Sequence, residues 1–205
     1  IDTELFEHFK PTPRHWAING SAGMGKSVLL AYSLQVFITD MYVVSRKGGF
    51  RDLNSFEDRA KEIQLPPIEK RQVWAVAMSE KQRHTLEATH DSMKSLYKEI
   101  NPYSHYQRVS PHIKLWSEVE DQLDDQCNIL LIDEAHDLSL PAQQKIKKWW
   151  EEKETNYLVV ACDRHQKLRL ISKSSVIIDG FDFRGHTSRL RRNYRNPAPC
   201  YFASI

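Results

Sequence analysis

A glycine-rich octapeptide near the N-terminus constrains the fold of this chain more than any other feature. Its residues are Gly20-Ser21-Ala22-Gly23-Met24-Gly25-Lys26-Ser27, and they match the pattern GxxxxGK[ST]. In that pattern a tight loop joins a strand to a helix, and its backbone N–H groups surround nucleotide phosphates, which side chains on the glycines would obstruct. The apolar run Trp16–Ile18 before it and the apolar residues Val28–Tyr32 after it suit this order. We therefore expect the octapeptide to bind ATP or GTP; an ordinary glycine turn before a helix is the alternative.

Two side chains of the octapeptide have predicted roles of their own. Lys26 would place a positive charge near the β and γ phosphates, and the hydroxyl of Ser27 would bind Mg²⁺. Such a site also needs an acidic group to complete the metal site. The expected strand Asn128–Ile132 contains four consecutive apolar residues, typical of a buried parallel strand, and is followed by Asp133 and Glu134. We expect Asp133 to hold Mg²⁺, directly or through water, and Glu134 to act as the general base. A solvated strand-to-helix turn is the alternative.

The order of apolar and amphipathic segments predicts an α/β domain with a parallel sheet and helices on both faces. A polar stretch at about residues 41–72 is longer than a usual connection, which predicts an insertion or a flexible flap. A short helix is expected after Asp163. The expected strands are Trp16–Asn19, Val73–Met78, Asn128–Ile132, Tyr157–Cys162 and Val176–Ile178, and the other expected helices lie near Lys26–Thr39, Glu80–Glu99 and Pro141–Glu152.

Composition agrees with one domain over residues 1–205 but does not identify a partner. The chain is 40% hydrophobic and 27% charged, and its net charge of +2 is too mild to establish nucleic-acid binding. Three widely spaced cysteines, Cys127, Cys162 and Cys200, favour reduced thiols over a disulfide framework. We expect an intracellular protein, by default cytoplasmic, with the nucleus or nucleoid left open. Because no apolar run reaches 18 residues, we expect no membrane partner.

Three segments beyond the octapeptide carry a resemblance to a known family. In chain order they are Asp133–Leu138, Ala161–Gln166 and Leu190–Arg195, the last containing Asn193-Tyr194-Arg195. They resemble motifs II, III and IV of superfamily 1 helicases of the UvrD/Rep type in residues, order and spacing. The resemblance covers about residues 14 to 205. It implies the first RecA-like P-loop ATPase domain of such a helicase, with the second RecA-like domain absent from this segment and expected downstream.

The resemblance also implies residue roles, cofactors and partners. Gln166 would sense the γ-phosphate and couple it to the nucleic-acid track, Arg195 would stabilise charge on the transferring phosphate, and Tyr194 would stack on adenine. ATP and Mg²⁺ are the implied cofactors, and single-stranded DNA or RNA is the implied partner. The stretch Val73–Lys81 looks like motif Ia, which meets the single-stranded backbone; a plain turn between strand and helix is the alternative.

Some residues depart from the family pattern. His136 stands where motif II commonly has glutamine, and Cys162 stands where motif III often has glycine. The residues Lys167–Arg169 lack the aromatic side chain that would stack on a base. Because the resemblance places the second RecA-like domain, which would close the nucleotide site, downstream of this segment, we expect this segment alone to bind nucleotide and hydrolyse it poorly.

Two further clusters have open interpretations. Five arginines could follow a phosphate backbone or form a solvated basic face. Of the adjacent Trp149 and Trp150, one should pack in the core, and the other could meet a partner domain or lie half-exposed. The arginines are Arg184, Arg189, Arg191, Arg192 and Arg195.

Three functions follow, from different classes. The first is the nucleic-acid-dependent ATPase motor of a superfamily 1-like helicase or translocase. The second is a helicase-like ATPase used as a sensor or switch in a larger regulatory or defence protein, motivated by the altered motif III and the insertion. The third is a signalling ATPase or nucleotide kinase unrelated to helicases, which requires the match at Asn193–Arg195 to be accidental.

Overall fold

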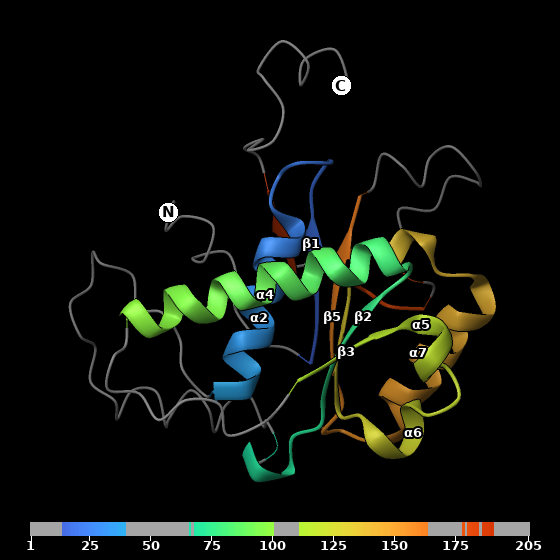
Figure 1. Ribbon diagram of the computed structural model, residues 1–205. Helices are drawn as coiled ribbons and strands as arrows, with labels where there is room; N and C mark the ends of the chain where they lie inside the picture. The colour runs from blue at the N-terminus through green and yellow to red at the C-terminus, as the bar shows by residue number, and fades with distance from the viewer. Residues whose placement is uncertain are drawn as a thin grey trace.

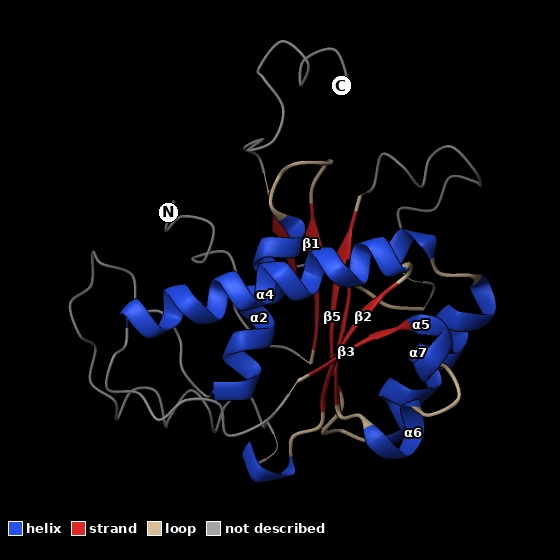
Figure 2. Ribbon diagram, viewed as in Figure 1, coloured by secondary structure: helices blue, strands red, loops and turns tan. Residues whose placement is uncertain are grey.

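The described strands of the computed structural model form one sheet in which every pairing is parallel (Figure 2). The strand order is β3-β2-β4-β5-β1-β6. The structure describes residues 14–39, 66, 68–100, 111–163, 178, 180–184 and 186–190. The strands are β1 (His15–Asn19), β2 (Val73–Ala77), β3 (His112–Leu115), β4 (Ile129–Ile132), β5 (Tyr157–Cys162) and β6 (Thr187–Arg189). The helices are α2 (Lys26–Thr39), α4 (Glu80–Ile100), α5 (Trp116–Val119), α6 (Leu123–Gln126) and α7 (Leu140–Glu152), with 3₁₀ turns η1 (Ile68–Lys70) and η2 (Ala135–Asp137).

Helices cover both faces of this sheet. In Figure 1 the long helix α4 crosses in front of the strands, with α2 next to it, and α5, α6 and α7 lie to the right. The helices α2 and α4 pack on one face of the sheet, and α5, α6 and α7 pack on the other. Side chains alternate between the two layers, as a strand requires. In β5, Val159 packs in the core under α2 and α4, while Leu158 and Val160 pack in the core under α7. The predicted α/β class, a RecA-like parallel sheet with helices on both faces, is confirmed.

The strand that precedes the octapeptide is not a neighbour of the strand that ends at Asp133. β5 lies between β1 and β4, pairing Ile18 with Ala161 on one side and Val160 with Ile132 on the other. Because all strands are parallel, their carboxyl ends meet at one edge of the sheet. The octapeptide, Asp133 and the residue after β5, Asp163, are therefore gathered at that edge.

Most predicted elements match the described ones within two residues, and α2 begins and ends as predicted. The predicted strand at Val176–Ile178 is wrong where it can be judged, because Ile178 lies in a bend whose carbonyl accepts the N–H of Phe181 at 3.3 Å. The apolar side chain of Ile178 instead belongs to the core, where it is buried together with Phe181. Two strands, β3 and β6, were not predicted. The short helix after Asp163 and nearly all of the predicted insertion lie outside the described residues.

The two adjacent tryptophans differ in burial, as the sequence predicts. Trp149 is fully buried, and its Nε1 donates a hydrogen bond to the carbonyl of Cys127 at 3.0 Å. Trp150 is half-buried, with the guanidinium of Arg14 4.2 Å from its ring centroid. Its Nε1 donates to the Arg14 carbonyl at 3.3 Å. Trp150 thus packs within this domain.

The cysteines and the apolar character of the helices can be compared with the expectations from the sequence. Neither Cys127 nor Cys162 forms a disulfide, and both side chains are buried. Burial raises the pKa of the Cys127 thiol far above its ordinary value. None of the helices within the described ranges combines the length and the apolar character that crossing a membrane requires.

Candidate nucleotide-binding site

The glycines of the octapeptide are required for two different reasons. Gly23 has a φ of 82° and Gly25 a φ of 90°, in the left-handed region that side-chain-bearing residues rarely adopt. At Gly20 the reason is space, because a Cβ atom there would lie 3.1 Å from Cβ of Leu190. The loop thus turns sharply between β1 and α2 and stays close to the end of β6.

Lys26 is held inside this loop. Its side chain is 6% exposed, and its Nζ lies 3.5 Å from the carbonyl oxygen of Ser21 and 4.0 Å from Oε1 of Glu134. Lys26 is also the first residue of α2, whose first N–H groups have no partner within the helix. An ammonium group, a helix N-terminus and the backbone N–H groups of the loop together favour an anion such as a phosphate.

Ser27 and Asp133 meet across the sheet edge. The Ser27 hydroxyl donates a hydrogen bond to Oδ2 of Asp133 at 2.8 Å, and the backbone N–H of Glu134 donates to Oδ1 at 3.0 Å. The Asp133 side chain is buried, which raises the pKa of its carboxyl, while the hydrogen bond from Ser27 acts in the opposite direction. A divalent cation bound here would offset the cost of burying the carboxylate.

This pair fits Mg²⁺ better than a metal that needs an all-protein cage. Among the described residues there is no cluster of three or more His, Cys, Asp or Glu that could hold a metal ion. Mg²⁺ commonly uses only one or two protein ligands and completes its octahedron with water and substrate phosphates. Ser27 and Asp133, the two residues predicted to bind Mg²⁺, are therefore close enough to bind one ion.

Glu134 has an unusual backbone conformation for its residue type. Its φ of 51° and ψ of 45° lie in the left-handed region, and no other non-glycine residue with positive φ is found in the described ranges. Such a conformation costs on the order of 1 kcal/mol or more, so the surroundings must hold it in place. Burial raises the pKa of the Glu134 carboxyl, and the nearby Lys26 opposes that rise. A carboxylate with a raised pKa is a stronger base at neutral pH.

His136 connects Glu134 to the end of β5. Its side chain is 6% exposed, and its Nδ1 lies 3.4 Å from Oε2 of Glu134. The same Nδ1 accepts the backbone N–H of Asp163 at 3.3 Å. An accepting Nδ1 places the proton of the neutral ring on Nε2, which lies 3.7 Å from Oδ1 of Asp137. In the sequence, His136 stands out only as a departure from motif II; its hydrogen bond with Asp163 depends on β4 and β5 being neighbours.

Other predicted site residues are not all placed. Gln166, Tyr194 and Arg195 lie outside the described residues. Of the five arginines, Arg184 and Arg189 are described, and Arg184 forms an ion pair with Asp182 at 2.6 Å. That pair lowers the pKa of the Asp182 carboxyl. Arg189 is exposed at the end of β6, where it is the strand partner of Asn19, the residue before the octapeptide.

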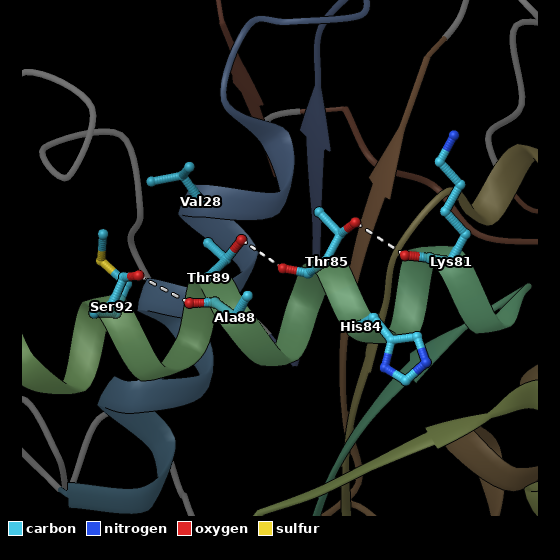
Figure 3. Close-up of a pocket in the computed structure, with 8 residues that line it drawn as sticks. Val28, Lys81, His84, Thr85, Ala88, Thr89 and Ser92 are labelled. Carbon is cyan, nitrogen blue, oxygen red and sulfur yellow. Dashed lines mark hydrogen bonds between the residues drawn. The ribbon is translucent and has the colours of Figure 1, made fainter.

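The stretch compared with motif Ia begins α4 beside this site. The Ser79 hydroxyl accepts the N–H of Gln82 at 3.4 Å, and the Gln82 side chain accepts the N–H of Met78 at 3.1 Å. Both polar side chains thus stabilise the turn between β2 and α4. A shallow groove of about 920 Å³ runs along α4 from there (Figure 3). Its lining residues are Val28, Lys81, His84, Thr85, Ala88, Thr89, Ser92 and Met93.

The hydroxyl groups in this groove are already used within the helix. Thr85 donates to the carbonyl of Lys81 at 2.9 Å, and Thr89 donates to the carbonyl of Thr85 at 2.6 Å. The groove therefore presents mainly methyl groups along α4, with Lys81 and His84 at the end toward the start of the helix (Figure 3).

Neither family models nor curated proteins supply a relative of this chain. No protein-family model matches the sequence, and no curated protein is similar enough to it to indicate descent. The candidate site is thus defined by its own geometry: a glycine-rich loop with Lys26 and Ser27 beside the carboxylates of Asp133 and Glu134.

Proposed function

We propose that this domain binds ATP with Mg²⁺ and hydrolyses it, as the first ATPase domain of a superfamily 1-like DNA or RNA helicase or translocase. One observation carries the proposal. The hydrogen bond between Ser27 and Asp133, 2.8 Å long, joins residues 106 positions apart, and Lys26 and Glu134 beside them lie 4.0 Å apart. Two motifs that were matched independently in the sequence therefore meet at one site. If either match were accidental, there would be no reason for the two to lie together.

Each of the four residues has a distinct role in this proposal. The N–H groups of the loop and the charge of Lys26 bind the phosphates, and Ser27 and Asp133 hold Mg²⁺, which when bound offsets the charge developing on the phosphates. Glu134 accepts a proton from the attacking water. Phosphate binding would draw the Lys26 ammonium from the Glu134 carboxylate, because a phosphate carries more charge. Glu134 then becomes available as a base only when nucleotide is present.

The nucleic-acid partner rests on the family resemblance and on position. Ser79 and Lys81 follow β2 at the same sheet edge as Asp133. In the proposal they meet a single-stranded backbone, and Gln166, Tyr194 and Arg195 take the roles that the resemblance implies. A second RecA-like domain downstream would complete the site, so that the isolated segment hydrolyses ATP slowly.

A switch is the second candidate, and His136 favours it. The link between the turn after β4 and the end of β5 is made by a buried histidine that also lies beside Glu134. A domain in which nucleotide state rearranges this link could signal to an attached effector instead of moving along nucleic acid. Its turnover would not depend on DNA or RNA.

Steady-state ATP hydrolysis by the full-length protein, with and without single-stranded DNA and RNA, separates the two candidates. Stimulation by either polymer that is lost in both Lys26→Ala and Glu134→Gln supports the motor. Slow turnover that neither polymer changes supports the switch. Lys148→Ala is the matched control, because Lys148 is an exposed lysine on α7, away from the site, that forms an i,i+4 ion pair with Glu152 at 3.8 Å. Absence of any nucleotide binding would overturn both.

A further inference from the structure

Met24 and Ser21 bind each other reciprocally inside the octapeptide. The backbone N–H of Met24 donates to the carbonyl of Ser21 at 3.3 Å. In return, the backbone N–H of Ser21 donates to the thioether sulfur of Met24 at 3.2 Å. Thioether sulfur is a weak acceptor, but a part-buried amide that loses its acceptor is left with an unsatisfied donor, which costs more than the weak bond itself.

The Met24 side chain is built into the domain and does not face solvent. It is 4% exposed and belongs to the core beneath α2, together with Leu190. Gly20 makes room for it, because a Cβ atom on Gly20 would lie 3.3 Å from Cβ and 3.4 Å from the sulfur of Met24. The sulfur is therefore closely packed against the loop whose N–H it accepts.

The same pair sets the direction of the Ser21 carbonyl. That oxygen accepts the N–H of Met24 and lies 3.5 Å from Nζ of Lys26. The two peptide groups on either side of the Ser21 Cα are thus both held by Met24, one through its sulfur and the other through its backbone N–H. The lysine that would meet the phosphates is thus aimed by a carbonyl that Met24 holds.

We propose that Met24 is a positioning residue for a nucleoside triphosphate, which keeps the loop in its anion-binding shape through the N–H···S hydrogen bond of Ser21. This inference rests on the proposed nucleotide-binding function. A loop that is already ordered binds its ligand without paying for ordering at the moment of binding. Loss of the sulfur acceptor, with side-chain volume kept, should therefore weaken nucleotide binding more than it weakens the fold.

The test compares Met24→Leu with Met24→Ala in the full-length protein. Leucine nearly conserves volume and removes the acceptor, whereas alanine also opens a cavity. We expect Met24→Leu to raise the Kd of fluorescently labelled ADP with Mg²⁺ about threefold to tenfold, the effect of one net hydrogen bond. Amide exchange at Ser21, measured by NMR, should accelerate by a similar factor. The thermal midpoint should stay near that of the wild type for Met24→Leu and fall for Met24→Ala.

Met93→Leu is the matched control, because Met93 is a partly buried methionine that packs on the same core from α4. It should leave the Kd and the exchange at Ser21 unchanged. Wild-type nucleotide affinity in Met24→Leu would overturn the inference, whether Ser21 exchange rises or not. If the wild-type protein itself binds no nucleotide, the proposed function fails and the inference falls with it; that outcome is recognised because Lys26→Ala and the wild type then behave alike.

Discussion

The backbone N–H of Asp163 donates a hydrogen bond to Nδ1 of His136 at 3.3 Å, so the end of β5 is tied to the turn that follows β4. His136 is also 3.4 Å from the carboxylate of Glu134, the proposed base. One buried ring therefore touches both the group that would activate water and the strand that leads toward Gln166. The first prediction concerns this ring.

Replacing His136 with alanine should impair turnover more than nucleotide binding. The loss leaves the Asp163 N–H without its acceptor and removes the packing beside Glu134, so the base is no longer held near its working position. We expect kcat for ATP hydrolysis to fall about tenfold or more, with the Kd of ADP changed about threefold or less. His136→Gln, which keeps an acceptor, should recover part of kcat. Equal losses in kcat and affinity would instead indicate a general disturbance of the site, and the exposed His112 provides an alanine control.

Asp133→Asn should separate stability from metal binding. Burial raises the pKa of the Asp133 carboxyl, which means that the folded state disfavours its charged form. The neutral amide removes that cost, so the variant should unfold at a higher temperature than the wild type in EDTA at pH 7.5. Asparagine is also a poorer Mg²⁺ ligand, so added Mg²⁺ and ADP should stabilise only the wild type. Equal stabilisation of both proteins by Mg²⁺ and ADP would exclude Asp133 from the metal site.

Acid should destabilise the fold through His15. Its ring packs against Trp150 at 5.2 Å and Phe183 at 5.4 Å between centroids, and burial lowers its pKa below the ordinary value. The charged or titratable groups around it are Arg14, Asp182 and His186. The unfolded chain protonates this histidine at a higher pH than the folded chain does. The contribution of His15 to the unfolding free energy is therefore fully present above about pH 6.5 and is lost as the pH falls below that value.

Urea unfolding at pH 7.5 and pH 5.5 measures this effect. His15→Gln should lose less stability than the wild type between the two pH values. Part of the acid sensitivity should remain, because burial also lowers the pKa of His90 and acts with the same sign. Raised carboxyl pKa values at Asp133 and Glu134 act with the opposite sign in both proteins and cancel in the comparison. Identical losses in wild type and variant would refute the role of His15.

The two adjacent tryptophans should differ in their contribution to stability. Trp149→Phe leaves the buried carbonyl of Cys127 without its donor and opens space in the core, so we expect a loss of about 2 to 4 kcal/mol. Trp150→Phe removes a partly exposed hydrogen bond and weakens the contact with Arg14, with an expected loss of about 1 kcal/mol. Chemical denaturation of the two variants gives both values. A larger loss at Trp150 would contradict the assignment of Trp149 to the core.

Local sequence patterns predicted the parts of the fold that depend on neighbouring residues. The bounds of α2 and the strand before Asp133 follow from the octapeptide and from an apolar run. β3 and β6 escaped prediction because they are short edge strands with polar residues, such as Thr187-Ser188-Arg189, whose extended form comes from pairing with β2 and β1. Edge strands bury only part of their surface, so their apolar signal is weak.

The sequence predicts which residues form the candidate site, but not the hydrogen bonds that link them to the rest of the fold. Lys26, Ser27, Asp133 and Glu134 were named from spacing, whereas the contact of His136 with Asp163 and the bond between Ser21 and Met24 depend on the fold. The left-handed backbone of Glu134 had no sequence signal, since glutamate rarely adopts it. Strand order, which makes β5 the neighbour of both β1 and β4, arises from long-range pairing that a pattern within one segment does not encode.

β5 also fixes the distance between β1 and β4. It is hydrogen-bonded along both edges and buried at all six residues, so β1 and β4 are held two strand spacings apart, about 10 Å in all. Side-chain substitutions cannot narrow or widen that gap, because backbone ladders define it. The backbones that carry the glycine-rich loop and Glu134 are therefore held at a separation set by main-chain geometry, and the side chains of Lys26 and Glu134 reduce it to the 4.0 Å between their charged groups.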